Sequence, residues 1–160
     1  MTSGLRPSDQ ESGADEPTTP SVPPEFAGWR RSPEGEVARW WSLTEALILR
    51  LRDEVEEVGS DFLLFYVASK PAIYDDVWDD IRRAYRMSEE EWSPTADADM
   101  LRVICDRGSI DCLISVERFR AGRTQLGSPE ALYYPIDGHW TAAGHGLAAR
   151  LIQRWLAERD

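Results

Sequence analysis

The spacing of apolar residues predicts a first helix over residues 43–58. Ser42 and Glu45 stand at the spacing of a capping box at its start, and Gly59 is a natural stop at its end. The apolar residues of this helix recur every three or four positions, so they share one face, which we expect to pack into the core. These residues are Leu43, Leu47, Leu51, Val55 and Val58.

Two segments farther along the chain predict strands. Residues 62–67 are apolar without interruption or alternation, a pattern typical of a strand that is buried on both faces of a parallel sheet. Residues 110–114 form a shorter second strand. The intervening residues 86–95, which are polar and contain Pro94, are expected to form a loop.

Further helices are predicted over residues 75–85 and 97–107, with one helical turn at 116–119 and a last helix over 142–158 that Thr141 can cap. The inward face of the last helix is expected to consist of Leu147, Leu151, Ile152, Trp155 and Leu156. The order helix, strand, helix, helix, strand, loop, helix favours a three-layer α/β fold with a parallel sheet.

Two strands are too few for such a sheet to bury both of its faces. Residues 62–67 are also too apolar for an exposed edge strand, because natural edges carry charges or proline. We therefore interpret residues 40–160 as an incomplete α/β domain, or as one whose sheet a partner completes. Residues 1–39 are rich in proline, serine, threonine and acidic residues, which predicts a disordered or loosely attached lead with Phe26 and Trp29 as its only anchors.

The formal net charge of -11 excludes functions that need a basic surface, such as binding nucleic acid or an anionic membrane. No apolar run approaches the ~20 residues that a membrane helix needs. The polar, acidic N-terminus does not resemble a secretory signal, so we expect the chain as given to be cytoplasmic. Cys105 and Cys112 fit no common zinc or redox spacing, and we expect both as small buried hydrophobes without a disulfide.

The segment from Tyr133 to His145 concentrates the candidate chemistry. Asp137 lies two residues before His139, where its carboxylate could accept the Nδ1–H of the imidazole and leave Nε2 free to take a proton from a serine. From spacing alone, the pair also fits a turn aspartate that caps the next helix, with the histidine on the surface. His145 could face His139, but no third ligand has a suitable spacing, so we predict no metal site.

Three further residues are candidates for binding a substrate. Lys70 follows residues 62–67, and ligands of open α/β sheets bind at the carboxyl ends of strands. The alternative is a solvated loop lysine. Trp140 and Tyr134 could line a pocket for an acyl group or a sugar, or could pack in the core. We find no glycine-rich phosphate loop and expect no cofactor.

The block Tyr-Tyr-Pro-Ile-Asp-Gly-His-Trp-Thr-Ala-Ala-Gly-His, residues 133–145, closely resembles the last sequence block of SGNH hydrolases, the GDSL-like esterases. It is most similar to the branch with Asp-x-His-Trp spacing, which includes alginate O-acetyltransferase-like proteins. Residues 67–74 also resemble that branch, in which a strand ends in a Pro-Ser/Asp-Lys-like turn with a tyrosine four residues later; here Ala68 takes the usual proline position. The resemblance covers residues 40–158.

This resemblance implies a flavodoxin-like parallel sheet with helices on both faces, of which residues 62–67 and 110–114 would be the last two strands. It also implies a Ser–His–Asp triad in which Asp137 orients His139 as the general base. The family's nucleophile comes from a Gly-Asp-Ser block, and neither that block nor Gly-x-Asn-Asp occurs in this sequence.

The resemblance therefore implies the C-terminal part of an esterase that acts on small-molecule or carbohydrate esters and is inactive alone, because it lacks the nucleophile block. A missing N-terminal half or a sheet-completing partner would complete the domain. One alternative is an O-acetyltransferase of the alginate-acetylation type. Another is a non-catalytic module that binds a partner through its unpaired strand.

Overall fold

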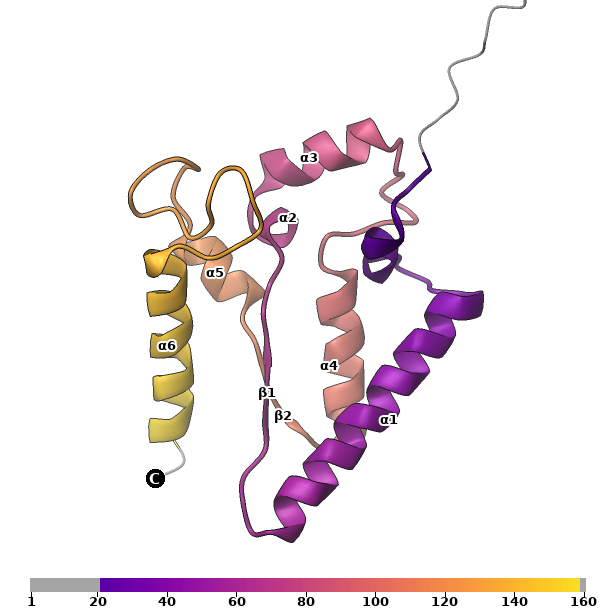
Figure 1. The fold of residues 1–160 in the computed structure, drawn as a ribbon, viewed down its shortest axis with the longest axis vertical. Helices are drawn as coiled ribbons and strands as arrows, with labels where there is room; N and C mark the ends of the chain where they lie inside the picture. Colours follow the sequence, from indigo (N-terminus) through magenta and orange to yellow (C-terminus); the bar gives the residue numbers. More distant parts are fainter. Residues whose placement is uncertain (1–20, 159–160) are drawn as a thin grey trace, which may run out of the picture.

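The computed structural model describes residues 21–158, and Figure 1 shows how the elements are arranged. The structure is a mixed α/β one, mostly helical, with one two-stranded sheet. In chain order the elements are η1 (Pro24–Trp29), α1 (Gly35–Glu57), β1 (Leu63–Tyr66), α2 (Lys70–Ile73), α3 (Asp75–Ala84), α4 (Ala96–Gly108), β2 (Asp111–Ile114), α5 (Val116–Gly122) and α6 (Ala142–Ala157).

The predicted strands pair with each other in parallel. Leu63 lies opposite Asp111 and Tyr66 lies opposite Ile114 in the register of β1 and β2. Figure 1 shows α1 and α4 on one side of this strand pair and α6 on the other. Within the described residues, the sheet contains only these two strands, so the edge of β1 that faces away from β2 is unpaired. The mixed α/β class and the incomplete sheet agree with the sequence prediction.

The main core lies around the strand pair and the start of α6. Its most deeply buried large side chains include those of Tyr133, Phe119 and Ile73. Because Tyr133 belongs to the loop before α6, the segment with the candidate chemistry is anchored in this core rather than attached loosely to it. Thr141 caps α6 as predicted, since its Oγ1 accepts a hydrogen bond from the backbone N–H of Gly144 at 3.3 Å.

A second, smaller core corrects the predicted lead over residues 1–39. Phe26 and Trp29 are its anchors as expected, but they form part of a folded cluster, in which Trp29 stacks on Phe26 and meets Trp78 edge-on. Residues 24–29 form η1 and α1 begins at Gly35, so the part of the lead that the structure describes is packed, not loose. Residues 1–20 of the predicted lead lie outside the described residues.

The predicted capping box is wrong. Helix α1 begins eight residues earlier than the predicted start at residue 43, and Ser42 lies inside it with its hydroxyl donating to the carbonyl oxygen of Ala38 at 3.1 Å. The pattern misled because serine in a helix interior can bond back to the preceding turn as readily as it can cap. The predicted stop holds, since α1 ends at Glu57 and Gly59 adopts a positive φ of 77°.

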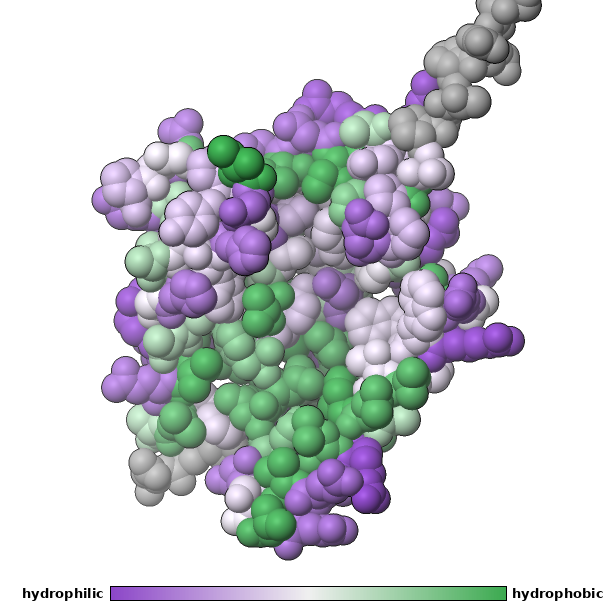
Figure 2. Space-filling model, in the orientation of Figure 1, coloured by the Kyte–Doolittle hydropathy of each residue, from purple (hydrophilic) through white to green (hydrophobic). Residues whose placement is uncertain are grey.

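The apolar face of α1 does not pack into the core. Leu43, Leu47 and Leu51 are 59%, 60% and 52% exposed, and Val58 is 78% exposed. Figure 2 has the orientation of Figure 1, in which β1 lies in front of β2, and it shows apolar surface gathered over α1 and the strand pair. The helix is present as the apolar period predicts, but the structure buries none of its residues. An exposed apolar face of this kind is typical of a surface that contacts another polypeptide.

The two cysteines form a disulfide, which corrects the expectation of two unpaired hydrophobes. Cys105 is near the end of α4 and Cys112 is in β2, and their Cα atoms lie 6.2 Å apart. Ser109 takes a left-handed conformation with φ of 50° and turns the chain back between them. The bond therefore closes the tight connection between α4 and β2.

The shorter elements also differ in part from the prediction. Residues 70–73 form the helix α2, which the sequence did not predict, and α5 extends to Gly122 rather than ending after one turn. Helices α3 and α4 and the loop over residues 86–95 lie where they were predicted. Along α6, Leu151 is buried but Leu156 is 54% exposed, so the last turn of the predicted inward face is open. No helix among residues 21–158 combines the length and the apolar character that crossing a membrane requires.

Candidate functional site

The loop between Tyr133 and Trp140 is a short hairpin held by its own backbone. These two residues form an isolated antiparallel bridge, and the N–H of Tyr134 donates to the carbonyl oxygen of His139 at 3.1 Å. The hydroxyl of Tyr133 donates to the backbone carbonyl oxygen of Ala68, two residues after β1. Burial raises the pKa of Tyr133 to about 12, so this hydroxyl keeps its proton and stays a donor at neutral pH. The hairpin is thereby fixed to the carboxyl end of β1.

Asp137 and His139 are brought together at the tip of this hairpin. The Oδ1 atom of Asp137 accepts the backbone N–H of His139 at 2.9 Å and lies 3.3 Å from His139 Nδ1. The backbone bond fixes the carboxylate and so positions it beside the ring. The side chain of His139 is 85% exposed, which leaves Nε2 open to an approaching group. This geometry can hold the imidazole in the Nδ1–H tautomer, the one that can accept a proton at Nε2.

Lys70 is tied to the same hairpin. Its Nζ donates to the backbone carbonyl oxygens of Tyr134, Pro135 and Asp137 at 3.1, 2.9 and 3.0 Å. An ammonium group has three N–H donors, and these three carbonyl groups can take all of them. Lys70 therefore has a structural role, because it holds the hairpin over α2. It is not the solvated loop lysine that the sequence left as the alternative.

Trp140 and Tyr134, the two predicted pocket residues, have different environments. Trp140 is half-buried, with its ring 5.2 Å from that of Phe119, 6.2 Å from that of Phe65 and 5.4 Å from that of His145. Tyr134 is 51% exposed. Trp140 is therefore mainly a packing residue under the hairpin, and Tyr134 is the aromatic side chain that stands open beside it.

His145 packs edge-on against Trp140, with the two ring centroids 5.4 Å apart. Among residues 21–158, no three histidine, cysteine or acidic side chains are grouped as a metal site would require.

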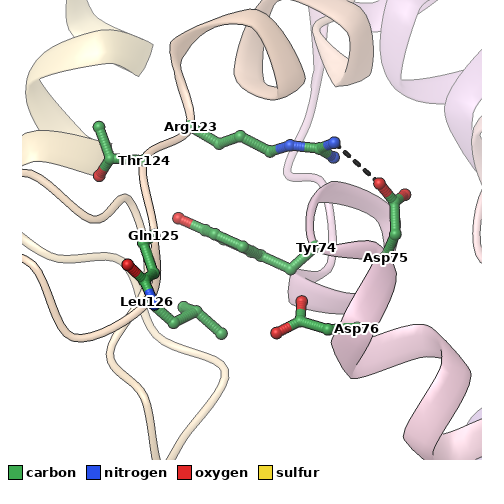
Figure 3. A pocket seen from close by; sticks show the side chains of 7 residues that line it. All are labelled: Tyr74, Asp75, Asp76, Arg123, Thr124, Gln125 and Leu126. Atoms are coloured by element: carbon green, nitrogen blue, oxygen red, sulfur yellow. Dashed lines mark hydrogen bonds and ion pairs between the residues drawn. The ribbon is translucent and has the colours of Figure 1, made fainter.

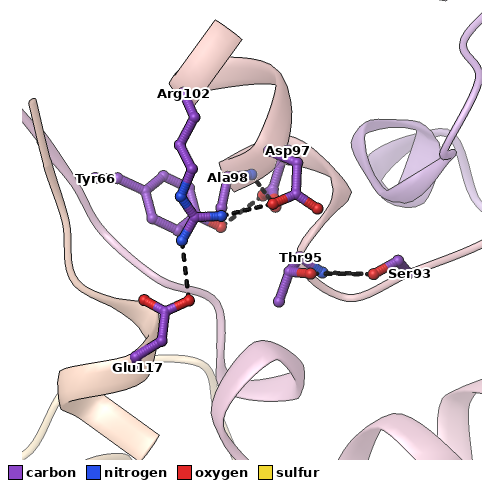
Figure 4. Close-up of polar contacts among 8 residues, drawn as sticks. Tyr66, Ser93, Thr95, Asp97, Ala98, Arg102 and Glu117 are labelled. Atoms are coloured by element: carbon purple, nitrogen blue, oxygen red, sulfur yellow. Dashed lines mark hydrogen bonds and ion pairs between the residues drawn. The ribbon is translucent and has the colours of Figure 1, made fainter. Parts of the chain in front are cut away.

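One pair of polar residues was missed by the sequence analysis. The hydroxyl of Tyr66, the last residue of β1, donates to Oδ2 of Asp97 in α4 at 2.8 Å (Figure 4). Burial raises the pKa of the Asp97 carboxyl, and burial together with the neighbouring Asp97 raises that of Tyr66. A polar atom at the end of an apolar strand was a signal, but its partner lies 31 residues away in sequence, a distance that no local pattern covers.

A polar hollow lies at the start of α3 (Figure 3), with a volume of about 340 Å³. Asp75 forms an ion pair there with Arg123, whose Nη2 lies 2.8 Å from the carboxylate. Arg123 also donates to the backbone carbonyl oxygen of Ile73. This arginine links the loop after α5 to the connection between α2 and α3, so its contacts are structural.

Comparison of the chain with protein-family models, curated proteins and solved structures finds no match. The geometry of the chain's own residues is therefore what supports any function proposed for it.

Proposed function

We propose that this chain is the acid–base part of an SGNH-type ester hydrolase, in which Asp137 orients His139 as the general base. The observation that carries the proposal is the contact of 3.3 Å between Asp137 Oδ1 and His139 Nδ1, with the other side of the imidazole open to solvent. The hydrogen bonds from Lys70 and Tyr133 support it further, because they hold this pair beside the carboxyl end of β1, where open α/β sheets bind their ligands.

In the proposed reaction, a serine from a polypeptide segment outside residues 1–160 attacks the carbonyl carbon of an ester. Nε2 of His139 takes the proton from the serine oxygen, and the Asp137 carboxylate stabilises the imidazolium that results. The tetrahedral intermediate collapses to an acyl-serine, and His139 returns the proton to the departing alcohol. Water then attacks the acyl-serine with His139 again as the base, which releases the acid and regenerates the serine.

The substrate class proposed is an acyl or acetyl ester, including esters of carbohydrates. An O-acetyltransferase of the alginate-acetylation type would use the same residues, with a sugar hydroxyl in place of water in the second step. Product analysis with a sugar acceptor separates the two, because transfer yields an acetylated sugar and hydrolysis yields free acetate.

The first test measures the tautomer of His139 by long-range nitrogen–proton NMR correlation at a pH where the ring is neutral. We expect the proton on Nδ1 in the wild-type protein, and a mixture that favours Nε2–H in Asp137→Ala. His145, which faces Trp140 instead of a carboxylate, is the control and should not change. A wild-type His139 that carries its proton on Nε2 would contradict the proposed role of Asp137.

The second test uses a serine-directed fluorophosphonate. The chain 1–160 should remain unlabelled, since it contains no Gly-Asp-Ser block. The protein translated from the longest reading frame that contains this chain should label at one serine, and His139→Ala should slow that labelling by on the order of a thousandfold or more. Labelling of a serine in the short chain would show that the nucleophile had been missed.

A second candidate function is a non-catalytic module that binds a partner by completing its sheet. It is favoured by the unpaired edge of β1 and by the exposed leucines of α1 beside it. A chain 1–160 that is monomeric and melts cooperatively would support this module. A chain that aggregates, or that lacks fixed tertiary packing, would support the incomplete hydrolase instead.

A further inference from the structure

A cavity of about 340 Å³ lies where η1, α1 and α4 meet the carboxyl end of β1. Its walls include the side chains of Val37, Trp40, Trp41 and Leu101, and its polar groups include Tyr66 and Asp97. The volume is within the range of small-molecule sites, which are mostly apolar with a few placed polar groups. Trp40 lines the cavity and is 47% exposed, so an indole side chain stands where the cavity meets solvent.

Asp97 is the one ionisable carboxyl among the described residues that line this cavity, and none of those residues is basic. Its Oδ2 accepts the hydroxyl of Tyr66 and its Oδ1 accepts the backbone N–H of Ala98, both at 2.8 Å. Each carboxylate oxygen has two lone pairs, so both can accept one more contact. Arg102, the arginine nearest to it in sequence, forms ion pairs with Asp99 and Glu117 instead. Figure 4 shows the pair with Glu117.

We propose that this cavity binds a small organic cation, an ammonium or quaternary ammonium group on an apolar body. Indole and phenol rings attract cations to their faces, and a carboxylate beside them adds a full opposite charge. An anionic ligand would be repelled by Asp97. A purely apolar ligand would cover the carboxylate without supplying a partner, which is unfavourable.

This site is separate from the one that contains His139. Successive side chains of a strand point to opposite faces of the sheet. Phe65 lies against Trp140, beneath the hairpin of Asp137 and His139, whereas the next residue, Tyr66, reaches Asp97 in α4. The cation site therefore does not depend on the proposed hydrolase activity, and each proposal can fail without the other.

The test compares two probes of the same shape on the chain 1–160, choline and 3,3-dimethyl-1-butanol, in which carbon replaces the charged nitrogen. Binding is followed by isothermal titration calorimetry and by tryptophan fluorescence, since two indoles line the cavity. We expect choline to bind at least about tenfold more tightly than the neutral alcohol. Equal affinities, or no binding of choline, would overturn the proposal, and this comparison needs no variant.

Variants then locate the site. Asp97→Asn can keep both hydrogen bonds, because an amide has an acceptor for Ala98 N–H and a donor for the Tyr66 oxygen. It should weaken choline binding at least about tenfold and leave the alcohol unchanged, since only the charge is removed. Asp106→Asn, an exposed acid on the same helix, is the matched control and should have no effect. Choline binding that survives in Asp97→Asn would place the cation elsewhere and refute the assignment.

Discussion

The ammonium group of Lys70 lies 3.0 Å from the backbone carbonyl oxygen of Asp137, the residue whose side chain contacts His139. Lys70 is the first residue of α2, the element that follows β1 in the chain. Its side chain therefore connects the segment after β1 to the acid–base pair. The hairpin itself is mostly exposed, with Ile136 at its tip 98% exposed. The order of this tip therefore depends on a few polar contacts, whereas the base of the hairpin is anchored by the buried Tyr133.

Replacing Lys70 should loosen this hairpin. In Lys70→Met three carbonyl oxygens lose a charged donor, and we expect a loss of about 1–2 kcal/mol in the free energy of unfolding. Hydrogen exchange should quicken at the amide of Tyr134, which bonds to His139 across the hairpin. Arg118→Met, at an exposed arginine of α5, is the control. Unchanged exchange at Tyr134 would mean that the backbone bonds suffice to hold the hairpin.

Two glycines of α6 should respond in opposite ways to alanine. A Cβ at Gly144 would overlap the carbonyl oxygen of Leu132 and lie 3.0 Å from the Cβ of Trp140. We expect Gly144→Ala to cost about 1–3 kcal/mol, because α6 and the hairpin must move apart. A Cβ at Gly146 meets only the flexible end of Arg150, so Gly146→Ala should gain up to about 1 kcal/mol from helix propensity. Urea unfolding of both variants measures the contrast, and equal effects would contradict the close packing at Gly144.

The disulfide between Cys105 and Cys112 should contribute measurably to stability. It closes a loop with a sequence separation of 7, for which the chain-entropy relation gives about 2–3 kcal/mol. Reduction with dithiothreitol should lower the free energy of unfolding by that amount in the wild type and not at all in the double variant Cys105→Ala, Cys112→Ala. A thiol assay on the unfolded, unreduced protein should detect no free cysteine. Two free thiols before reduction would show that the bond is absent.

Much of the local structure could be predicted because it depends on neighbouring residues. The strand at Leu63–Tyr66 and the helices α3, α4 and α6 follow from apolar spacing, and the cap by Thr141 follows from residue type. The pairing of Asp137 with His139 could be proposed for the same reason, since the two are separated by one residue.

What could not be predicted depends on contacts between distant residues. The periodicity of α1 identified its apolar face but not whether a neighbour covers that face, and the leucines on it are exposed. Lys70 gave no local sign of its bond to the Asp137 carbonyl, 67 residues away, and Tyr66 gave none of its bond to Asp97. Folding of the region around Trp29 depends in the same way on Trp78, to which no pattern before residue 40 points.

Asp97 should make stability depend on pH. Burial raises the pKa of its carboxyl above the ordinary value of 3.8, so the folded protein holds this proton to a higher pH than the unfolded chain does. The stabilisation associated with the bound proton is full below pH 3.8 and is lost as the pH rises through the raised pKa. Asp97→Asn has no such proton to lose and should gain stability relative to the wild type over that interval.

Urea unfolding at a series of pH values from 3.5 upward, an interval chosen to begin below the ordinary pKa, measures this difference. Asp61→Asn, at an exposed loop position, is the control for the removal of one negative charge from an acidic chain. If the free energies of unfolding of wild type and Asp97→Asn differed by the same amount at every pH, the carboxyl would titrate at the same pH in the folded and unfolded states.

The two sides of α1 should differ sharply in their tolerance of polar residues. Leu47 is 60% exposed, and Leu47→Gln should change the free energy of unfolding by no more than about 0.5 kcal/mol. Leu49 is half-buried and points at Gly108 in α4, and Leu49→Gln should cost about 1–3 kcal/mol because its amide would displace apolar packing.

The same pair of variants tests whether the exposed apolar face of α1 contacts another polypeptide. Leu47→Gln should reduce the binding of a hydrophobic dye and any concentration-dependent association in the ultracentrifuge, since it removes part of an open apolar surface beside an unpaired strand. If Leu47→Gln destabilised the monomer as strongly as Leu49→Gln, this face would already be packed within the chain. Loss of association without loss of stability would instead mark α1 and the edge of β1 as the surface at which another polypeptide completes the sheet.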